Sequence, residues 1–230
     1  MTQPMILPIA EHFHSYQGEG RWTGTPMHFI RTAGCSVGQH PEAVTWEIAK
    51  DNNFPILKTG NTAYVCHTYD GRPFWCDTDF QKGEWLSVAD LIDETWERHI
   101  CLTGGEPFLL RDKLPELFER AKLKGVQIHV ETSGTIAWLP PMPTWITVSP
   151  KVNYLKYMIG VADEIKLLVD KDFDYEKVPD DIKQRADVYV QPINNELSID
   201  LDNLERCKNV TRIRPDWKIS FQTHKFVNWR

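Results

Sequence analysis

The chain has 230 residues, of which 41% are hydrophobic and 25% are charged, and its formal net charge is -6. This composition is that of an ordinary globular protein, long enough for one sizeable α/β domain. The negative charge argues against a non-specific nucleic-acid binder, which would present a basic face. The N-terminal segment lacks a secretory pattern, and no apolar run approaches the roughly 20 residues that span a bilayer. We therefore expect one cytoplasmic domain over residues 1–230 that binds neither membranes nor nucleic acid.

The first 26 residues are predicted to form a glycine-bearing loop that precedes the first strand. The glycines Gly18, Gly20 and Gly24 lie in this segment, but their spacing is not that of a dinucleotide-binding fingerprint. The segment that follows, residues 27–33, has the apolar character of a buried strand. It ends at Gly34-Cys35.

From residue 85 onward, predicted helices and strands alternate. Ser87 is expected to cap a helix that runs to Arg98, and a second helix is expected over Lys113–Lys124 with Gly125 as its stop. A later helix is predicted around Leu201–Lys208. The predicted strands cover residues 100–103, 126–131, 145–148, 164–169, 188–190 and 218–221. This alternation indicates right-handed βαβ units, a parallel sheet and therefore an α/β fold.

Polar side chains follow the C-terminal ends of the predicted strands. Parallel α/β barrels and sheets place their active sites at that edge, so we expect these residues to form one site. The clusters are Gly34-Cys35, Thr103–Glu106, Glu131–Ser133, Ser149–Lys151, Gln191 and Gln222–His224.

Three of the five cysteines, Cys35, Cys66 and Cys76, lie between residues 34 and 78. Without an export signal, the thiols are expected to be reduced and to serve as ligands or core residues. Their spacing does not match the tight pairs of a zinc ribbon, although His67 beside Cys66 keeps a four-ligand zinc site open. The alternative is an iron–sulfur cluster, in which three thiolates leave one iron free to bind a substrate or cofactor.

A series of short motifs resembles the 7-carboxy-7-deazaguanine synthase family of radical S-adenosylmethionine enzymes. The resemblance runs from about residue 13 to the end of the chain and leaves only residues 36–65 uncovered. The Gly-Gly-Glu-Pro element is shared by many radical S-adenosylmethionine enzymes, whereas Gln-Gly-Glu-Gly, Cys-Asp-Thr and Gln-Thr-His-Lys are more particular to this family. The motifs are Gln17–Gly20, Phe29–Arg31 leading to Gly34-Cys35, Trp75–Asp79, Leu102–Pro107, Glu131–Thr135, Ser149–Lys151, Val190–Pro192 and Ser220–Lys225.

The chain departs from the family at one cysteine. The second and third cysteines of the family are commonly two residues apart, which would place a cysteine where this chain has Pro73. We take Cys66 as the displaced ligand, with residues 68–74 looped out between the two thiols. Cys101, inside an apolar strand, and Cys207, at helical spacing, are predicted to be buried core residues.

The resemblance implies a partial, incomplete TIM-like βα barrel with an extended cluster-binding loop, in which residues 36–65 are an insertion. It also implies three cofactors: a [4Fe–4S] cluster, S-adenosylmethionine and Mg²⁺. Cys35, Cys66 and Cys76 would hold the cluster, and Thr78 would bind Mg²⁺. The residues expected at S-adenosylmethionine are Gly104, Gly105, Glu106, Ser149, Pro150, Lys151, Gln191, Pro192, Ile193 and Asn194.

The substrate implied by the resemblance is 6-carboxy-5,6,7,8-tetrahydropterin. A radical generated from S-adenosylmethionine would initiate its ring contraction to 7-carboxy-7-deazaguanine, with loss of ammonia, in 7-deazapurine (queuosine-type) biosynthesis. Arg31 suits the substrate carboxylate, and Glu19 suits the pterin N–H groups. The residues expected at the substrate are Tyr16, Gln17, Gly18, Glu19, Arg31, Thr103, His224 and Arg230.

The family further suggests a homodimer and an electron donor such as flavodoxin. Two other functions are weighed against this one. A glycyl-radical activase would also use a radical S-adenosylmethionine site but would bind a large protein, without needing Arg31, Thr78 and the Gln-Thr-His-Lys end around a pterin. A zinc-stabilised binding module would carry no cluster.

Overall fold

The computed structural model describes residues 4–38, 64–76, 78–194, 198–227 and 229. Most of the predicted insertion at residues 36–65, together with Arg230, lies outside the described residues. The elements in chain order are β1 (Ile6–Tyr16), η1 (Gly20–Trp22), β2 (Pro26–Thr32), β3 (Tyr64–His67), β4 (Pro73–Cys76), β5 (Glu84–Ser87), α2 (Val88–Glu94), β6 (His99–Gly104), η2 (Pro107–Leu110), α3 (Leu114–Lys124), β7 (Gln127–Thr132), β8 (Trp145–Val148), α4 (Lys156–Val161), β9 (Glu164–Val169), η3 (Tyr175–Lys177), α5 (Asp180–Lys183), β10 (Val188–Pro192), α6 (Leu201–Ile213), β11 (Lys218–Ile219) and α7 (Thr223–Phe226).

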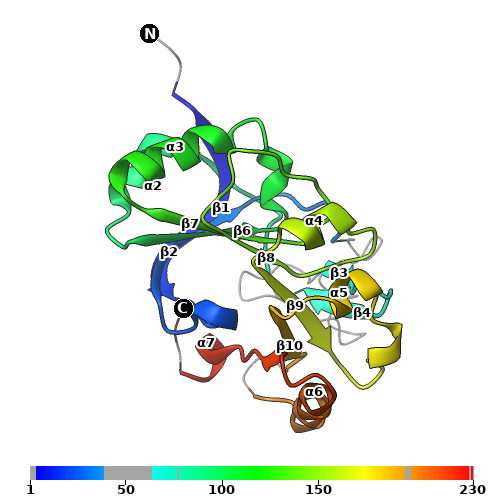
Figure 1. Cartoon of the computed structure of the whole chain (residues 1–230). Helices are drawn as coiled ribbons and strands as arrows, with labels where there is room; N and C mark the ends of the chain where they lie inside the picture. Colours follow the sequence, from blue (N-terminus) through cyan, green and yellow to red (C-terminus); the bar gives the residue numbers. More distant parts are fainter. Residues whose placement is uncertain (1–3, 39–63, 77, 195–197, 228, 230) are drawn as a thin grey trace, which may run out of the picture.

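The described residues form a nine-stranded sheet in the order β11-β10-β9-β8-β7-β6-β2-β1-β5 (Figure 1). In this order, each pair of adjacent strands from β11 across to β2 is parallel, as the alternation of helices and strands predicts. β1 is antiparallel to β2 and to β5. The prediction of a loop before the first strand was therefore wrong for residues 6–16, because alternate side chains of this segment, Leu7 and Ile9, are buried in the core.

The two faces of the sheet differ in polarity. The outer face, which packs against the helices, supplies the apolar core with Ile30, Ile100, Leu102, Ile128, Val130, Ile146, Val148, Ile165, Leu167, Val188 and Val190. The inner face carries polar residues at the alternating positions: the register pairs Arg31 with Thr103, and Tyr189 with Lys166. Parallel strands covered on both faces usually read as continuous apolar runs. The polar inner face therefore marks the side of the sheet on which a site can form.

The helices match the predictions at their starts better than at their ends. Ser87 caps α2 by accepting from Ala89 N at 3.1 Å, as expected, but the helix ends at Glu94 and not at Arg98. Thr95 leaves the helix in an extended conformation, and its hydroxyl donates to Leu91 O at 2.8 Å. α3 stops at Gly125 in the left-handed conformation, as predicted, and α6 continues five residues beyond the predicted end, to Ile213.

A separate hairpin, β3–β4, carries two of the three clustered thiols. Residues 68–74 were predicted to loop out, but Pro73 and Phe74 belong to β4, and only the segment between the strands forms the turn. The register pairs Cys66 with Phe74 and Tyr64 with Cys76. This hairpin lies at the rim of the large sheet, because Thr68 bridges to Lys151, three residues after the end of β8 at Val148.

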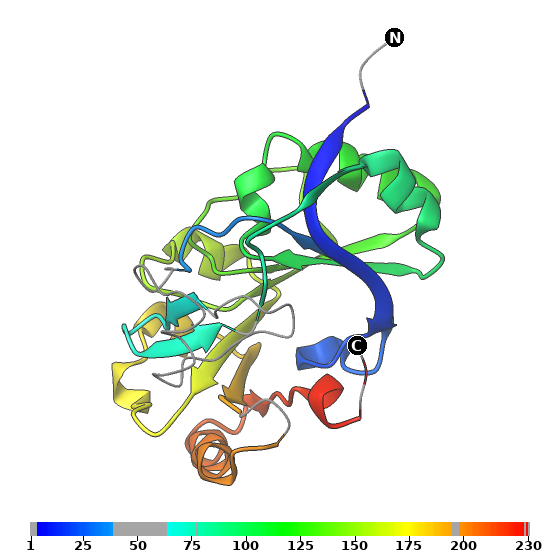
Figure 2. The same cartoon turned by 180° about the vertical axis from the view of Figure 1, so that it is seen from behind.

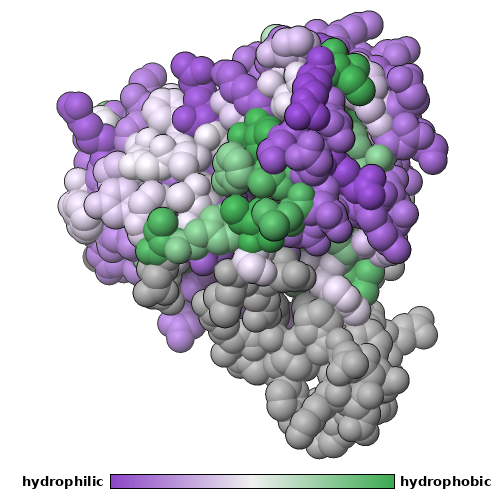
Figure 3. Space-filling view, turned by 90° about the horizontal axis from the view of Figure 1, so that it is seen from below, coloured by the Kyte–Doolittle hydropathy of each residue, from purple (hydrophilic) through white to green (hydrophobic). Residues whose placement is uncertain are grey.

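The C-terminal segment returns to the first strands. α7 lies beside η1 in both views of the chain (Figures 1 and 2), and Thr223 N donates to Gly18 O at 2.9 Å. Figure 3 shows that the face seen from below is mostly hydrophilic, with hydrophobic residues gathered near its middle. None of the helices in the described part of the chain is long and apolar enough to cross a membrane.

Candidate active site

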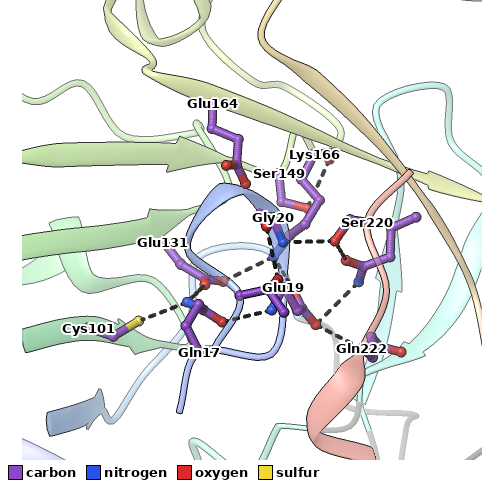
Figure 4. Close-up of polar contacts among 12 residues, drawn as sticks. Gln17, Glu19, Gly20, Cys101, Glu131, Ser149, Glu164, Lys166, Ser220 and Gln222 are labelled. Atoms are coloured by element: carbon purple, nitrogen blue, oxygen red, sulfur yellow. Dashed lines mark hydrogen bonds and ion pairs between the residues drawn. The ribbon is translucent and has the colours of Figure 1, made fainter. Parts of the chain in front are cut away.

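A buried lysine is the centre of a polar network on the inner face. Figure 4 shows Lys166 of β9 beside Glu19 and Glu131. Its ammonium donates to Glu19 Oε2 and, at 3.2 Å, to Glu131 Oε2. Sequence reasoning did not select Lys166 as a site residue. The available signal was a lysine inside the otherwise apolar strand Ile165–Val169, on the face opposite the core.

The second oxygen of Glu19 is also fully engaged. Glu19 Oε1 accepts from Gln222 Nε2 at 3.0 Å and from Gln191 Nε2 at 3.3 Å. Burial alone would raise the pKa of Glu19, but attraction to Lys166 and the hydrogen bond from it lower that pKa to about 2. Glu19 is therefore an ionised carboxylate held from three directions. Gln191 was predicted near S-adenosylmethionine, and the structure places its amide on Glu19.

Gln17 links the Gln-Gly-Glu-Gly loop to β6 and β7. Its Nε2 donates to Glu131 Oε1 at 3.0 Å, and its Oε1 accepts from Glu19 N at 3.1 Å. Gln17 Nε2 also lies 3.8 Å from Cys101 Sγ. Cys101 is buried, as predicted, but it faces this polar network and does not belong to the apolar core cluster, whereas Cys207 does.

The C-terminal motif packs directly against the same loop. A Cβ added at Gly18 would lie 2.2 Å from His224 Nδ1, so only a glycine allows this approach. The structure thus brings Gln17, Gly18, Glu19 and His224, which the resemblance assigns to the substrate, close together. Tyr16, at the end of β1, packs against Trp229 with ring centroids 5.0 Å apart and the rings tilted by 34°.

Arg31 and Thr78 come together although they lie far apart in the sequence. Arg31 Nη1 donates to Thr78 Oγ1 at 3.4 Å, and its Nε donates to Glu11 Oε1 at 2.8 Å. Thr103 sits beside Arg31 in the strand register. Arg31 thus joins the predicted magnesium ligand Thr78 to the carboxylate of Glu11, which the sequence did not point to. Hydroxyl and carboxylate oxygens are ligands that Mg²⁺ accepts.

The Gly-Gly-Glu-Pro loop packs onto the segment that carries the first thiol. A Cβ at Gly105 would lie 1.9 Å from Gly34 O, and Glu106 N donates to Gly34 O at 3.0 Å. The Glu106 side chain is fully buried and accepts from Thr132 Oγ1 at 2.8 Å and from Ser133 N at 2.9 Å. Its carboxylate thus ties this loop to the end of β7. Because the side chain is used in this way, a ligand at this loop would be bound by backbone groups.

The hairpin register places two thiols on one face. Cys66 pairs with Phe74, two residues before Cys76, so Cys66 and Cys76 are diagonal neighbours on the same side. His67 follows Cys66 directly and therefore points to the opposite face of the hairpin. This geometry argues against a zinc site that combines Cys66 with His67.

Cys35 and the hairpin thiols share Lys151 as a neighbour. Burial lowers the pKa of Lys151, and the nearby Cys66, Cys76 and Cys35 partly oppose that shift. The Lys151 ammonium lies 5.3 Å from the centre of the Phe74 ring, on the thiol-bearing face of the hairpin. Cys35 Sγ also accepts from Gly38 N at 3.3 Å. Hydrogen bonds to sulfur of this kind tune iron–sulfur clusters.

In the described parts of the chain, no three His, Cys, Asp or Glu side chains are grouped closely enough to hold a single metal ion. A [4Fe–4S] cluster places a weaker demand on its ligands, because each thiolate binds a different iron atom. The shared face of Cys66 and Cys76, the N–H donors at Cys35 and the common neighbour Lys151 fit such a set of ligands.

The remaining residues predicted at S-adenosylmethionine lie along the ends of β8 and β10. Ser149 Oγ donates to Lys166 O at 3.3 Å and accepts from Lys151 Nζ at 3.0 Å. Ile193 N donates to Val169 O at 2.8 Å, and Asn194 Nδ2 donates to Gln222 Oε1 at 3.4 Å. The side chains of Pro150 and Pro192 are buried.

Comparisons with known proteins give a consistent result. No family model matches the chain. The chain is 32% identical over 242 residues to 7-carboxy-7-deazaguanine synthase of Escherichia coli K12, covering 97% of this chain and 99% of that protein. It is 31% identical over 238 residues to the enzyme of the same name from Synechocystis, covering 97% and 93% of the two chains.

Its structure resembles the crystal structure of QueE from Escherichia coli with a TM-score of 0.66 and 27% identity, covering 96% of this chain and 95% of that chain. Both sequence relatives match over almost their full length. The relatives are enzymes, and the structural match extends over the same range of the chain. The chain therefore belongs to the 7-carboxy-7-deazaguanine synthase family.

Proposed function

We propose that this chain converts 6-carboxy-5,6,7,8-tetrahydropterin to 7-carboxy-7-deazaguanine by a radical ring contraction with loss of ammonia. The observation that supports this most strongly is the set of three thiols around Lys151, at the rim next to the Glu19–Lys166 network. Family membership supports the product named in the relatives. The radical mechanism, the substrate and the cofactors are part of this proposal.

We propose that Cys35, Cys66 and Cys76 hold a [4Fe–4S] cluster and that S-adenosylmethionine binds beside it, at Gly104–Gly105 and at Ser149–Lys151. When bound, the cluster and S-adenosylmethionine supply the radical chemistry that removes a hydrogen atom from the substrate. The backbone of the two glycines can approach a ligand closely because it carries no side chain. Gln191 and its neighbours up to Asn194 would complete this end of the pocket.

The chain's own residues would bind and orient the substrate. The planar guanidinium of Arg31 suits the substrate carboxylate, and Thr78 beside it would carry Mg²⁺ together with substrate oxygens. Glu19, held ionised, accepts hydrogen bonds from the amino and ring N–H groups of the pterin. Gln17, Thr103 and His224 would border the same space, and the contact of α7 with Gly18 supports the place of His224 in it.

We further propose that residues 1–230 form one domain, a partial βα barrel of the radical S-adenosylmethionine type, with residues 36–65 as an insertion. The open parallel sheet with a polar inner face supports this reading. A cytoplasmic homodimer and an electron donor such as flavodoxin belong to the same proposal. The terminal carboxylate of Arg230 is proposed at the substrate as well.

The test is anaerobic reconstitution with iron and sulfide, followed by an assay. We expect a brown protein that absorbs at ~400 nm, as is typical of thiolate-bound iron–sulfur clusters. With S-adenosylmethionine, Mg²⁺ and a reductant it should form 7-carboxy-7-deazaguanine. The matched control is the variant with Cys35, Cys66 and Cys76 all changed to alanine. Colourless protein that contains stoichiometric zinc would refute the proposal, and so would product formation no greater than that of the control.

A further inference from the structure

The inner side of the sheet holds a group of four ionisable side chains, two of them buried and two partly exposed, with only one positive charge among them. Lys166 is 5% exposed, and Glu164 on the same strand is 3% exposed. Glu19 and Glu131 bind the ammonium directly, whereas Glu164 accepts from Arg21 N at 2.9 Å. Burial raises the pKa of Glu164 to about 7, so this third carboxylate readily holds a proton. Lys166 is therefore the cation that lowers the pKa of Glu19 and keeps this carboxylate ionised.

The two carboxylates that Lys166 joins come from different parts of the chain. Glu19 lies in the loop between β1 and η1, and Glu131 lies near the end of β7. Each carboxylate also accepts hydrogen bonds from glutamine amides: Gln17 donates to Glu131, whereas Gln191 and Gln222 donate to Glu19. One ammonium thus fixes the relative position of the N-terminal loop and the inner strands, and through Gln222 that of the C-terminal segment.

Stability alone does not account for this arrangement. Replacing a buried ion pair by apolar side chains of similar volume is often neutral or stabilising, because desolvation of the charges offsets their attraction. The opposite face of β9 shows that this strand accommodates apolar residues, since Ile165, Leu167 and Val169 are buried there. A buried lysine on the inner face is thus better explained by what it does to Glu19 than by the folding energy it contributes.

We propose that Lys166 is a positioning residue for the reaction: it holds Glu19 ionised and oriented so that Oε2 of the carboxylate, which accepts from Lys166 whereas Oε1 accepts from two glutamines, receives the N–H edge of the substrate. The inference rests on the proposed function and adds a residue to it. We assign Lys166 to act through Glu19, because two of the three ammonium protons are donated to Glu19 and Glu131. Glu131 in turn holds the ammonium through the second of these hydrogen bonds.

The experiment compares Lys166→Met, Lys166→Arg and the exposed-lysine control Lys156→Met in reconstituted enzyme. Lys166→Met keeps the length of the side chain and removes the charge. We expect its KM for 6-carboxytetrahydropterin to rise roughly 10- to 100-fold, with a smaller change in kcat, because a charged hydrogen bond is lost in binding. Cluster absorbance and the KM for S-adenosylmethionine should be unchanged. Lys166→Arg should recover part of the affinity, and Lys156→Met should match the wild type.

A pH profile separates positioning from a purely structural role. In the wild type Glu19 stays ionised throughout the neutral range, because Lys166 keeps its pKa low. Without Lys166, burial raises the pKa of Glu19, so KM in Lys166→Met should increase as the pH falls, beyond any change in the wild type. The groups that face Glu19 are Glu131, Glu164, Lys166, Gln191, Gln222 and His224. Because Lys166 also lowers the pKa of Glu164, the comparison is made in a Glu164→Gln background, which leaves Glu19 to carry the difference.

The outcomes are distinguishable. If the wild type forms no product, the proposed function fails and this inference fails with it. If the wild type is active but Lys166→Met keeps the wild-type KM at every pH, the function stands and the positioning role is refuted. If Lys166→Met does not fold, Glu131→Gln is tested instead. This change removes the second negative charge that pairs with the Lys166 ammonium and keeps an amide oxygen that can accept from Gln17. It should raise KM in the same direction by a smaller factor, and an unchanged KM would overturn the inference.

Discussion

Arg72 and Asp170 form a largely buried ion pair that fastens the thiol-bearing hairpin to the end of β9. The Arg72 side chain is 11% exposed and that of Asp170 is 19% exposed. Arg72 Nη2 also donates to Leu168 O at 3.0 Å, and Nε donates to Asp70 Oδ2 at 2.8 Å. The guanidinium further lies 5.3 Å from the centre of the Phe173 ring. Each of its nitrogens thus has a partner, and the hairpin is held to the sheet independently of any metal.

Replacing Arg72 by alanine should loosen the hairpin and lower the iron content after reconstitution. Removing one partner of a buried pair costs about 3–5 kcal/mol, and the partial exposure here places the expected loss near the lower value. Iron and sulfide per chain and the thermal midpoint would be measured. The control is Arg120→Ala, which breaks an exposed pair with Glu116 on α3 and should cost below ~0.5 kcal/mol. Full iron content in Arg72→Ala would show that the hairpin needs no such anchor.

Cys66 and Cys101 should differ in their effect on the cluster although both are buried thiols. Cys66→Ala removes a sulfur on the same hairpin face as Cys76, so we expect loss of the absorbance near ~400 nm. Cys101 faces Gln17 on the inner strand, and Cys101→Ala should retain the cluster. Absorbance and iron analysis of the two variants decide the point. The reverse pattern would identify Cys101 as the ligand and disprove the assignment of Cys66.

Gly105→Ala should displace the segment that carries Cys35. The new Cβ would lie 1.9 Å from Gly34 O, and a backbone oxygen cannot move aside cheaply. We expect a loss of roughly 1–3 kcal/mol in unfolding free energy, together with a lower cluster occupancy. Gly160→Ala on α4 is the matched control, because no atom lies within 4 Å of its added Cβ. That variant should be stabilised by up to ~1 kcal/mol. Urea unfolding and iron analysis measure both effects.

The stability of the fold should fall as the pH drops from about 6.5 to about 4, because burial lowers the pKa of His28 to about 4. The neutral ring is accommodated by Thr95 Oγ1 at 2.7 Å from Nδ1 and by His12 Nδ1 at 3.1 Å from Nε2. The unfolded chain binds a proton in this interval that the folded chain does not, so the contribution is complete above pH 6.5 and is lost below it. The expected loss is on the order of 3 kcal/mol.

The measurement is urea unfolding of the wild type and His28→Asn at several pH values. The groups around His28 include His12, His14 and Lys124, and they disfavour its charged form. His129 has a similarly lowered pKa and adds to the slope of unfolding free energy against pH. Glu164 opposes that slope, because its pKa is raised to about 7 and its contribution to the stability of the fold is lost as the pH rises. These groups are common to both proteins, so the slope should be shallower in His28→Asn. Equal slopes would contradict the assignment.

The strands and the rim of polar motifs could be predicted from the sequence because each depends on local pattern. Runs such as Glu164–Val169 and the stop at Gly125 are recognisable without tertiary information. The strand Ile6–Tyr16 was missed because its exposed positions are polar and aromatic, and only pairing with β2 and β5 reveals it. The hairpin was read as a loop for the same reason, since its register is set by contacts between distant residues.

The sequence points to residues of the candidate site where they belong to motifs and not where they lie inside a strand. Gln17, Glu19 and His224 lie in recognisable motifs, and the structure brings them together. Lys166 and Glu11 lie in strands, where one residue in two faces inward. A lysine inside an apolar strand marks an unusual position, but the partners that make it part of a network come from distant segments. The sequence did not identify Arg72 as an anchor of the hairpin either, because that role depends on its ion pair with Asp170, almost a hundred residues away.

The alternation of apolar and polar side chains along the parallel strands has an evolutionary consequence. Side-chain direction repeats every two residues, so deleting one residue within β9 would turn Lys166 into the apolar core and bring Leu167 to the inner side. The same holds for Arg31 on β2 and Glu131 on β7. Divergence in this family should therefore preserve the lengths of the inner strands strictly and accumulate insertions and deletions between them.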